Sequence, residues 1–286
     1  MKICSNRLTK YLRLVIDPHF KTFNDQYFSY HGQCDMVLSH SNGFADGLGL
    51  HIHIRTTRVN NPHMDYSYIS GTAVKIGLDV VEVSEDGALF VNGAESVFLD
   101  DNEDYGTYFG RNRNFTIARS IKGEKKRIVY YDMILGQTMN IQIRSNTKTG
   151  MLFVDVNGSF SDSKGLLGAS PTEERPLLSR DGMIDLTGQW NTYGEEWQVN
   201  DMDPKLFRDN ARRPQYPHGC LYEADTNDNN HAHVRRRLMD SRGKVTLDAA
   251  TNACAHLKKD MKRKFCVDDV MATGDLDILE DPFYYN

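Results

Sequence analysis

Alternating apolar and polar residues run through the first half of this chain and restrict the folds open to it. In GLGLHIHIRTT, residues 47–57, aliphatic side chains occupy every second position, with histidine or arginine between them. The aliphatic set is Leu48, Leu50, Ile52 and Ile54, and the polar set is His51, His53 and Arg55. Residues two apart lie on the same face of a strand, so the stretch predicts an antiparallel strand with one buried and one solvated face.

The same alternation returns later, between turn signals. NIQIRS and MLFVDVNG repeat it, with Ile141, Ile143, Leu152, Val154 and Val156 in the apolar positions. The pairs Asp86-Gly87, Asn92-Gly93 and Asn157-Gly158 tolerate positive φ and separate such runs. Many short strands joined by tight turns predict an antiparallel β-sandwich or barrel.

Near the C-terminus the period changes to that of a helix. Apolar side chains at Leu247, Ala250, Cys254, Leu257, Met261 and Phe265 are three or four residues apart and predict one helix face. A basic run, Lys258, Lys259, Lys262, Arg263 and Lys264, would fall in the C-terminal half of that helix, where cations suit the dipole. Asp248, Asp260 and Asp268 interrupt or flank the run, which favours a solvated face over a polyanion site.

The five cysteines are too scattered for a CxxC metal site. They are Cys4, Cys34, Cys220, Cys254 and Cys266. In one continuous helix Cys254 and Cys266 would lie about 18 Å apart, beyond the ~7 Å limit for a disulfide. Either the helix breaks between them or each pairs elsewhere, with Cys34 and Cys220 as the available partners.

Composition narrows the function classes. A net charge of −5 gives no reason to expect nucleic acid as a partner, and no apolar run reaches the ~20 residues that span a bilayer. The basic start of the chain, MKICSNRLTKYLRLVI, has no uninterrupted apolar stretch, so no signal peptide is predicted in it.

The cysteine and histidines of the first half are better explained as structural residues than as catalytic or zinc-binding ones. Cys34 lies near His19 and His31, but no third group orients an imidazole toward it, so we predict no nucleophilic pair. His51 and His53 share a strand face, yet zinc needs further ligands, and the HAH of residues 231–233 lies in a polar loop. Solvated strand histidines are the better interpretation.

Calcium is the stronger metal candidate. The loop DDNEDYGTYFG offers hard oxygens from Asp100, Asn102 and Asp104. DTNDNN, residues 225–230, begins with the ligand spacing of an EF-hand, but Arg236 stands where that loop needs a bidentate Glu.

The segment DPHFKTFNDQYFSYHGQCDMVL, residues 17–38, resembles the start of the von Willebrand factor type D domain. Ile16 replaces the usual Gly of that family's opening motif, and the motif itself is matched by Asp17, Pro18, His19 and Phe20. The resemblance continues through residues 49–57 and 67–77. It ends with the Gly-Leu-x-Gly and Trp-x-Val segment of residues 165–199, including Gly165, Leu166, Gly168 and Trp197.

This resemblance implies four parts. They are an N-terminal lead (1–15), a type D-like β-sandwich (16–210), a polar connector (211–245) and a helical Cys-bearing tail (246–286) that resembles the module following type D domains in some surface proteins. It also implies that Cys34 is half of a disulfide, and we expect Cys220 as its partner. No cysteine flanks the Gly-Leu motif, so one family disulfide is absent.

Some family members bind calcium beside the Gly-Leu motif. Here the corresponding positions are Asn24, a neutral ligand, and Ala169, which has no side-chain oxygen. Asp181 and Asp185 remain as candidate ligands, so calcium is expected at most as a weakly bound cofactor.

The resemblance implies an extracellular or cell-surface structural or adhesive protein, not an enzyme, that binds a protein partner or itself. Two alternatives stay open. One is a calcium-dependent recognition module, and the other is a carbohydrate-active hydrolase that uses a carboxylate pair from Glu82, Glu95, Asp132 and Asp155. The sequons at Asn114 and Asn157 are candidate glycosylation sites.

Overall fold

The computed structural model describes residues 18–58, 67–96, 105–111, 115–122, 128–135, 139–158, 162–169, 176–209 and 245–274, together with residues 276 and 279. The predicted lead (1–15), almost all of the predicted connector (211–245), Asp17, Cys4 and Cys220 lie outside these residues.

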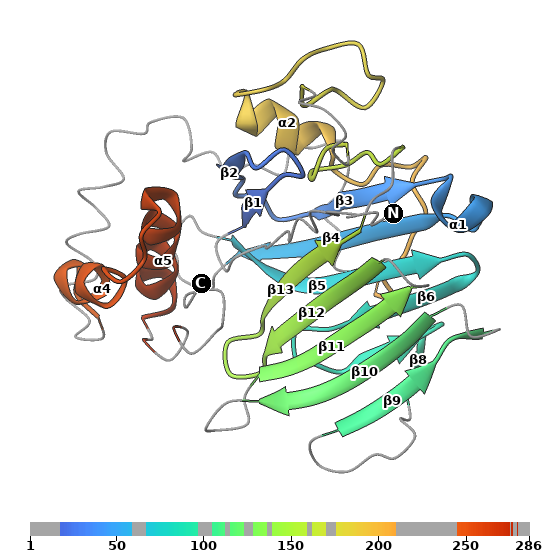
Figure 1. Ribbon diagram of the computed structural model, residues 1–286, viewed down its shortest axis with the longest axis horizontal. Coiled ribbons are helices and arrows are strands. Elements are labelled where there is room, and N and C mark those ends of the chain that lie inside the picture. The colour runs from blue at the N-terminus through green and yellow to red at the C-terminus, as the bar shows by residue number, and fades with distance from the viewer. Residues whose placement is uncertain are drawn as a thin grey trace, which may run out of the picture.

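Two antiparallel sheets form the body of the molecule (Figure 1). The six-stranded sheet has the order β3-β4-β5-β6-β7-β8. Its strands are β3 (Asp35–Ser41), β4 (Leu50–Arg58), β5 (Ser67–Ile76), β6 (Asp79–Val83), β7 (Leu89–Val91) and β8 (Ala94–Glu95). The five-stranded sheet has the order β13-β12-β11-β10-β9. Its strands are β9 (Tyr105–Phe109), β10 (Phe115–Lys122), β11 (Ile128–Leu135), β12 (Met139–Asn146) and β13 (Met151–Asn157).

Smaller elements complete the sandwich. A two-stranded ladder joins β1 (His19–Lys21) to β2 (Tyr27–Ser29). The helix α1 (Phe44–Gly47) is a single turn before β4, and α2 (Trp190–Glu196) lies over the β1–β2 ladder (Figure 1). The prediction of a mainly β fold built from antiparallel sheets is therefore confirmed.

The aliphatic alternation of the sequence forms the core between the sheets. Leu50, Ile52 and Ile54 of β4 are fully buried, as are Ile141 and Ile143 of β12, and all five belong to one apolar cluster. The turn predictions hold as well: Gly87 has φ 80° between β6 and β7, and Asn92 and Gly93 have φ 53° and 83° between β7 and β8. Period and turn chemistry together fix these strands.

The other face of β4 is not solvated, which corrects the prediction for it. His53 is 1% exposed and Arg55 9% exposed, while His51 is half-buried. Leu206 and Phe207 cover this face, packing on Ala73, the cross-strand partner of His53. The covering segment follows β4 by about 150 residues, so the local pattern of β4 contains no sign of it.

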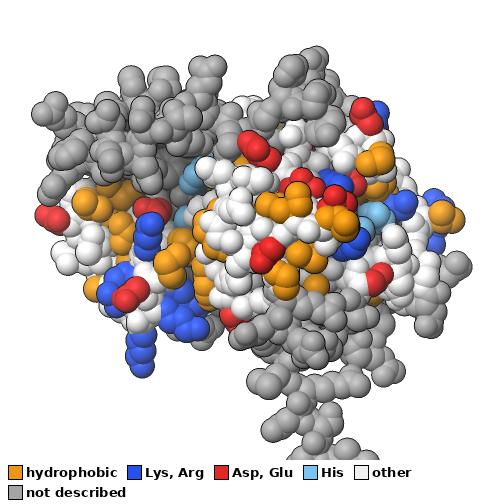
Figure 2. Space-filling view, turned by 90° about the horizontal axis from the view of Figure 1, so that it is seen from above, with side chains coloured by type: hydrophobic (Ala, Val, Ile, Leu, Met, Phe, Trp, Pro, Cys, Tyr) orange, Lys and Arg blue, Asp and Glu red, His pale blue; other side chains and the backbone are white. Residues whose placement is uncertain are grey.

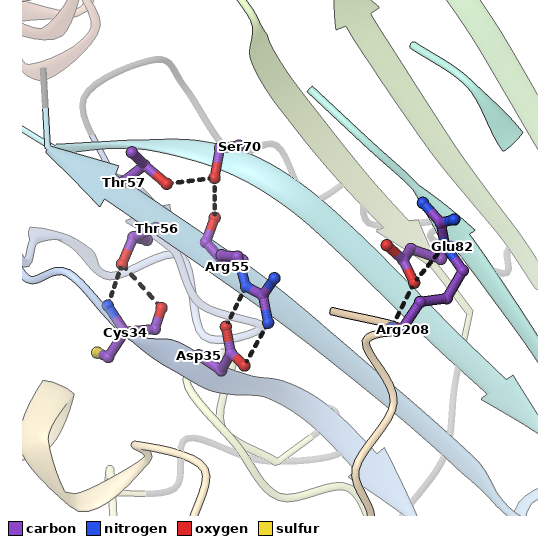
Figure 3. A network of polar contacts seen from close by, with 8 residues as sticks. All are labelled: Cys34, Asp35, Arg55, Thr56, Thr57, Ser70, Glu82 and Arg208. Carbon is purple, nitrogen blue, oxygen red and sulfur yellow. Dashed lines mark hydrogen bonds and ion pairs between the residues drawn. The ribbon is translucent and has the colours of Figure 1, made fainter. Parts of the chain in front are cut away.

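Polar groups on the covered face are paired (Figure 3). The guanidinium of Arg55 donates from Nε and Nη2 to the carboxylate of Asp35, at 2.7 and 3.0 Å, and stacks on the Phe207 ring. Arg208, the residue after Phe207, forms an ion pair with Glu82, with Nε and Oε2 3.4 Å apart. These contacts anchor residues 206–208 on the six-stranded sheet.

The tail forms two helices and not one continuous helix. The first, α4 (Leu247–Ala253), follows the N-cap Thr246, and six residues separate it from the second, α5 (Asp260–Thr273). The break brings Cys254 and Cys266 within 5.9 Å between Cα atoms, and they form a disulfide. Of the two alternatives left open by the spacing, the broken helix is therefore correct.

The predicted single apolar face is accordingly wrong at two positions. Leu247 and Met261 are 39% and 41% exposed, because each lies in the first turn of a separate helix. Leu257 and Phe265, in contrast, are buried as predicted.

The helical module docks against the sandwich (Figure 1). Its buried residues Leu257 and Val270 share an apolar cluster with Met151 and Phe153 of β13. The ring of Phe265 stacks on His19 of the opening motif, with centroids 3.7 Å apart. Within the described part of the chain, no helix is both long and apolar enough to cross a membrane.

Candidate functional site

Two segments distant in sequence bond to the outer edge of β3. Backbone hydrogen bonds join residues 164–167 to residues 37–40, and residues 197–199 to residues 35–37. An open strand edge invites pairing with other chains, and here the protein's own backbone occupies it. The two segments lie side by side as a result, and the candidate site is built between them.

Gly165 sets the path of the first segment. Its φ is +127°, and a Cβ at this position would lie 2.6 Å from the carbonyl oxygen of Leu38. The hydroxyl of Tyr193, on α2, donates to the Gly165 carbonyl oxygen at 2.7 Å. Burial raises the pKa of Tyr193, so this hydroxyl stays protonated as a donor.

A pocket of about 190 Å³ opens where these segments meet. Its wall includes Gly165, Gly168, Leu178, Tyr193 and Trp197. Trp197 is 2% exposed and Tyr193 1% exposed. Packing in the core therefore fixes the two aromatic rings that line the pocket. The Gly-Leu-x-Gly and Trp-x-Val motifs of the sequence thus form opposite parts of one cavity.

Arg180 holds the loop beside the pocket in place. Its side chain donates to the backbone oxygens of Glu196 (3.2 Å) and Gln198 (2.9 Å), and to both carboxylate oxygens of Asp203 (2.9 and 3.0 Å). Its guanidinium also lies over the Trp197 ring, 5.1 Å from the centroid. A planar guanidinium that uses its donors in this way fixes three backbone segments relative to one another.

The loop anchored by Arg180 carries exposed apolar side chains. Met183 is 83% exposed and Ile184 57% exposed, directly after Gly182 of the pocket wall, and Met202 is 86% exposed beside Asp203. In Figure 2, hydrophobic side chains gather on this face close to acidic, basic and histidine side chains. We call the exposed side chains Met183, Ile184 and Met202 the apolar loop. Large apolar side chains on a rigid support are typical of binding surfaces.

A histidine pair lies on the same side of β3. His40 and His51 are cross-strand partners whose rings stack with centroids 5.5 Å apart, and His40 also lies 6.4 Å from the Trp197 ring. Burial lowers the pKa of both, and each has cationic neighbours that add to the effect, Lys164 and Arg180 for His40 and Lys75 for His51. Asp203 opposes the shift for both rings, and Asp162 opposes it for His40.

We expect this pair to make stability fall on acidification. Because the folded pKa of each ring lies below its ordinary value of 6.5, the unfolded chain binds more protons in the interval between the two values. Stability is therefore complete above about pH 6.5 and is lost as the pH falls through the lowered values. Thermal unfolding from pH 8 to pH 5 should show a decreasing midpoint.

Variants assign the effect to the pair. His40→Gln/His51→Gln should flatten the dependence of the unfolding midpoint on pH over this range. His256→Gln, at an exposed position between α4 and α5, removes one histidine elsewhere and serves as the control. An equal slope in the wild type and the double variant would show that other groups cause the acid sensitivity.

The structure describes three of the calcium candidates, Asn24, Asp181 and Asp185. Asp181 and Asp185 are exposed and each serves a turn, accepting from Met183 N–H and Thr187 N–H, both at 2.9 Å. Hydrogen bonds from Ser179 and Thr187 lower the pKa of the respective carboxyl groups. Among the described residues, no three His, Cys, Asp or Glu side chains lie close enough to hold a metal ion. Asp100, Asn102 and Asp104 lie outside the described residues.

The carboxylates of the hydrolase alternative occur in separate surroundings. Asp132 and Asp155 face outward from the five-stranded sheet, on the strands on either side of Gln142. Two strand spacings separate their Cα atoms, which is about 10 Å. Asp132 accepts from Gln142 at 2.6 Å and Asp155 from Arg144 at 3.1 Å. Glu82 is paired with Arg208 on the other sheet, and Glu95 lies on the exposed β8.

The cysteine and histidine candidates are largely structural. Cys34 is disulfide-bonded, as predicted, and cannot act as a nucleophile. Because Cys254 and Cys266 bond to each other, neither is its partner, and the predicted partner Cys220 lies outside the described residues. The rings of His51 and His53 are 6.4 Å apart and nearly perpendicular, and residues 231–233 lie outside the described residues.

The remaining motif residues pack as architecture. Pro18, His19 and Phe20 are buried, and Nδ1 of His19 shares a hydrogen bond with the Ser29 hydroxyl at 2.5 Å. Asn157, one glycosylation candidate, ends β13 half-buried, and Asn114 lies outside the described residues.

Sequence reasoning did not single out Arg180, Met183, Ile184, Met202 or His40. A signal for the loop was present, since Asp181-Gly182 is a turn pair followed by two apolar residues. No local signal marks Arg180 as an anchor, because its partners lie 16 to 23 residues away.

Comparison with known proteins gives no assignment: no family model matches the chain, and no curated protein matches it.

Proposed function

We propose that this chain is a non-enzymatic extracellular structural or adhesive module, of the von Willebrand factor type D kind, that assembles through the apolar loop and its pocket. The ordered motifs of residues 17–38 and 165–199 support the family. The Cys254–Cys266 disulfide supports an oxidising compartment, because such bonds persist mainly outside the cytosol.

One observation carries the mode of assembly: an exposed apolar loop is rigidly anchored beside a partly apolar pocket. Met183 and Ile184 remain in water although Arg180 fixes the loop through hydrogen bonds to two backbone carbonyls and one carboxylate. A preorganised loop loses little conformational entropy on association, so this cost offsets less of the free energy gained by burying its side chains. Apolar anchors that enter pockets are typical centres of binding energy.

The arrangement is self-complementary. Gly182 of the pocket wall directly precedes Met183, so the exposed loop and the pocket adjoin each other. Under a two-fold axis, each copy can place its loop in the pocket of the other, as an isologous contact requires. The proposed partner is therefore a second copy of this chain.

Sedimentation velocity over a concentration series tests this function. The wild type should form dimers as its concentration rises. Met183→Asp, which places a charge on the loop, and Leu178→Arg, which places one in the pocket wall, should each keep the protein monomeric. Leu78→Asp is the matched control, because Leu78 is 88% exposed at the β5–β6 turn, and it should dimerise like the wild type.

Mixing the two variants is the decisive experiment. A mixed dimer of Met183→Asp with Leu178→Arg has one intact loop-in-pocket contact and one Asp–Arg contact, so mixing should restore dimers. A wild type that stays monomeric at every concentration, or a Met183→Asp variant that dimerises normally, would refute assembly through this surface.

A further inference from the structure

The break in the tail places its basic run at the N-terminus of a helix and not at a C-terminus. The cations of residues 258–264 were expected near the C-terminal end of one helix, whereas α5 begins at Asp260 and carries no basic residue in its last turn. They therefore surround the N-terminus of α5, the positive end of the helix dipole. We call residues 256–264 the basic corner.

The helix dipole does not favour cations at this end of α5. Residues at a helix N-terminus are stabilising when acidic, and Asp260 is the acidic residue of the first turn. Its side chain is 95% exposed and lies 3.5 Å from Nη1 of Arg263. The N-cap, Lys259, makes no side-chain capping bond to the first turn. The positive charges of the side chains and the positive end of the helix dipole therefore lie together at the N-terminus of α5.

The corner is also held in shape. The Cys254–Cys266 disulfide ties α4 to α5, and the guanidinium of Arg263 donates to the Leu257 carbonyl oxygen from Nε (3.1 Å) and Nη2 (2.7 Å). Lys258, Lys259 and Lys264 are exposed, and none of them is ion-paired with a described residue. Their charges are therefore presented from a rigid frame and remain available.

The basic run is dense for its length. Five of the 34 Lys and Arg residues fall within residues 258–264, in a protein whose net charge is −5. In Figure 2, basic side chains gather on the helical module, with acidic side chains beside them. Because the chain as a whole is acidic, the basic corner favours a narrow, flexible polyanion over a broad anionic surface, which would also meet acidic parts.

We propose that the basic corner binds a linear sulfated polysaccharide. Several cations within a few residues suit a chain of repeated anionic groups better than one small anion. The choice of sulfated sugar over nucleic acid rests on the extracellular setting of the proposed function, where sulfated sugars are the available polyanions. The site is separate from the apolar loop, so either can fail without the other.

Fluorescence anisotropy with a labelled, highly sulfated heparin oligosaccharide tests the proposal, using the full chain with its disulfides intact. Affinity should fall as salt rises, because binding releases counterions. Lys258→Gln/Lys259→Gln/Lys264→Gln should weaken binding about tenfold or more at low salt and reduce the slope of log K against log salt. Lys75→Gln/Lys148→Gln/Lys205→Gln changes net charge equally elsewhere and should bind like the wild type.

Two further readouts distinguish the causes of failure. The corner triple variant should unfold at the same temperature as the wild type or higher, because it removes cations from a helix N-terminus, so weaker binding cannot result from misfolding. Met183→Asp should bind the oligosaccharide normally. Absence of binding at low salt, equal loss in both triple variants, or equal binding of a single-stranded DNA of matched charge would overturn the proposal.

Discussion

Replacing Arg55 by Ala is expected to lower the free energy of unfolding by about 3–5 kcal/mol. The guanidinium forms two hydrogen bonds with Asp35 (Figure 3), whose side chain is only 3% exposed. It also covers the Phe207 ring. Without it, a desolvated carboxylate loses its countercharge, and residues 206–207 lose one wall of their packing. Urea unfolding with the disulfides intact measures the difference.

Two controls separate the buried ion pair from charge in general. Lys21→Ala removes the exposed Lys21–Asp25 pair, joined at 2.6 Å, and should cost about 1 kcal/mol or less. Asp35→Leu/Arg55→Met replaces both charges by apolar groups and should recover most of the stability, because no unpaired charge remains. If Arg55→Ala is no worse than Lys21→Ala, the pair does not stabilise this face of the sheet.

The second large effect is expected at Gly165, where substitution by Ala should cost about 3 kcal/mol or more. Its φ of +127° strains any L side chain, and the added Cβ would approach the Leu38 carbonyl oxygen to 2.6 Å, with no flexible side chain able to yield. The segment that bonds to β3 must then shift, and the pocket changes with it. Thermal and urea unfolding both report this loss.

Gly182→Ala isolates the backbone part of the cost. Gly182 has φ +79°, but no atom beyond its chain neighbours lies within 4 Å of the position that a Cβ would take, so strain alone should cost about 1–2 kcal/mol. A loss at Gly165 equal to that at Gly182 would show that close approach to β3 is unimportant.

Much of the sandwich follows from local sequence. The alternation around Ile52 and Ile141 identifies strands and the core face of each, since a side chain's face depends only on its place in the strand. Turn pairs such as Asn92-Gly93 mark hairpins, because they accept the backbone angles that tight turns need. The buried opening motif and the disulfide state of Cys34 also agree with the prediction from sequence.

The candidate site was less accessible to such reasoning. The family resemblance left Asp181 and Asp185 as candidate calcium ligands, whereas their described side-chain contacts stabilise turns. Arg180 has no distinguishing context in the sequence, yet it holds the apolar loop by contacts with three separate residues. A residue's role as an anchor depends on which distant groups surround it, and period and spacing contain no information about those groups.

The sequence by itself determined the strands, their inward faces and the helical character of the tail, because these depend on interactions between residues a few positions apart. The tertiary structure alone decided that the second face of β4 is covered by Leu206 and Phe207, that the tail breaks at its disulfide, and that the basic run surrounds a helix start. Each of these outcomes depends on long-range burial or a covalent link, whose free energy outweighs local preference.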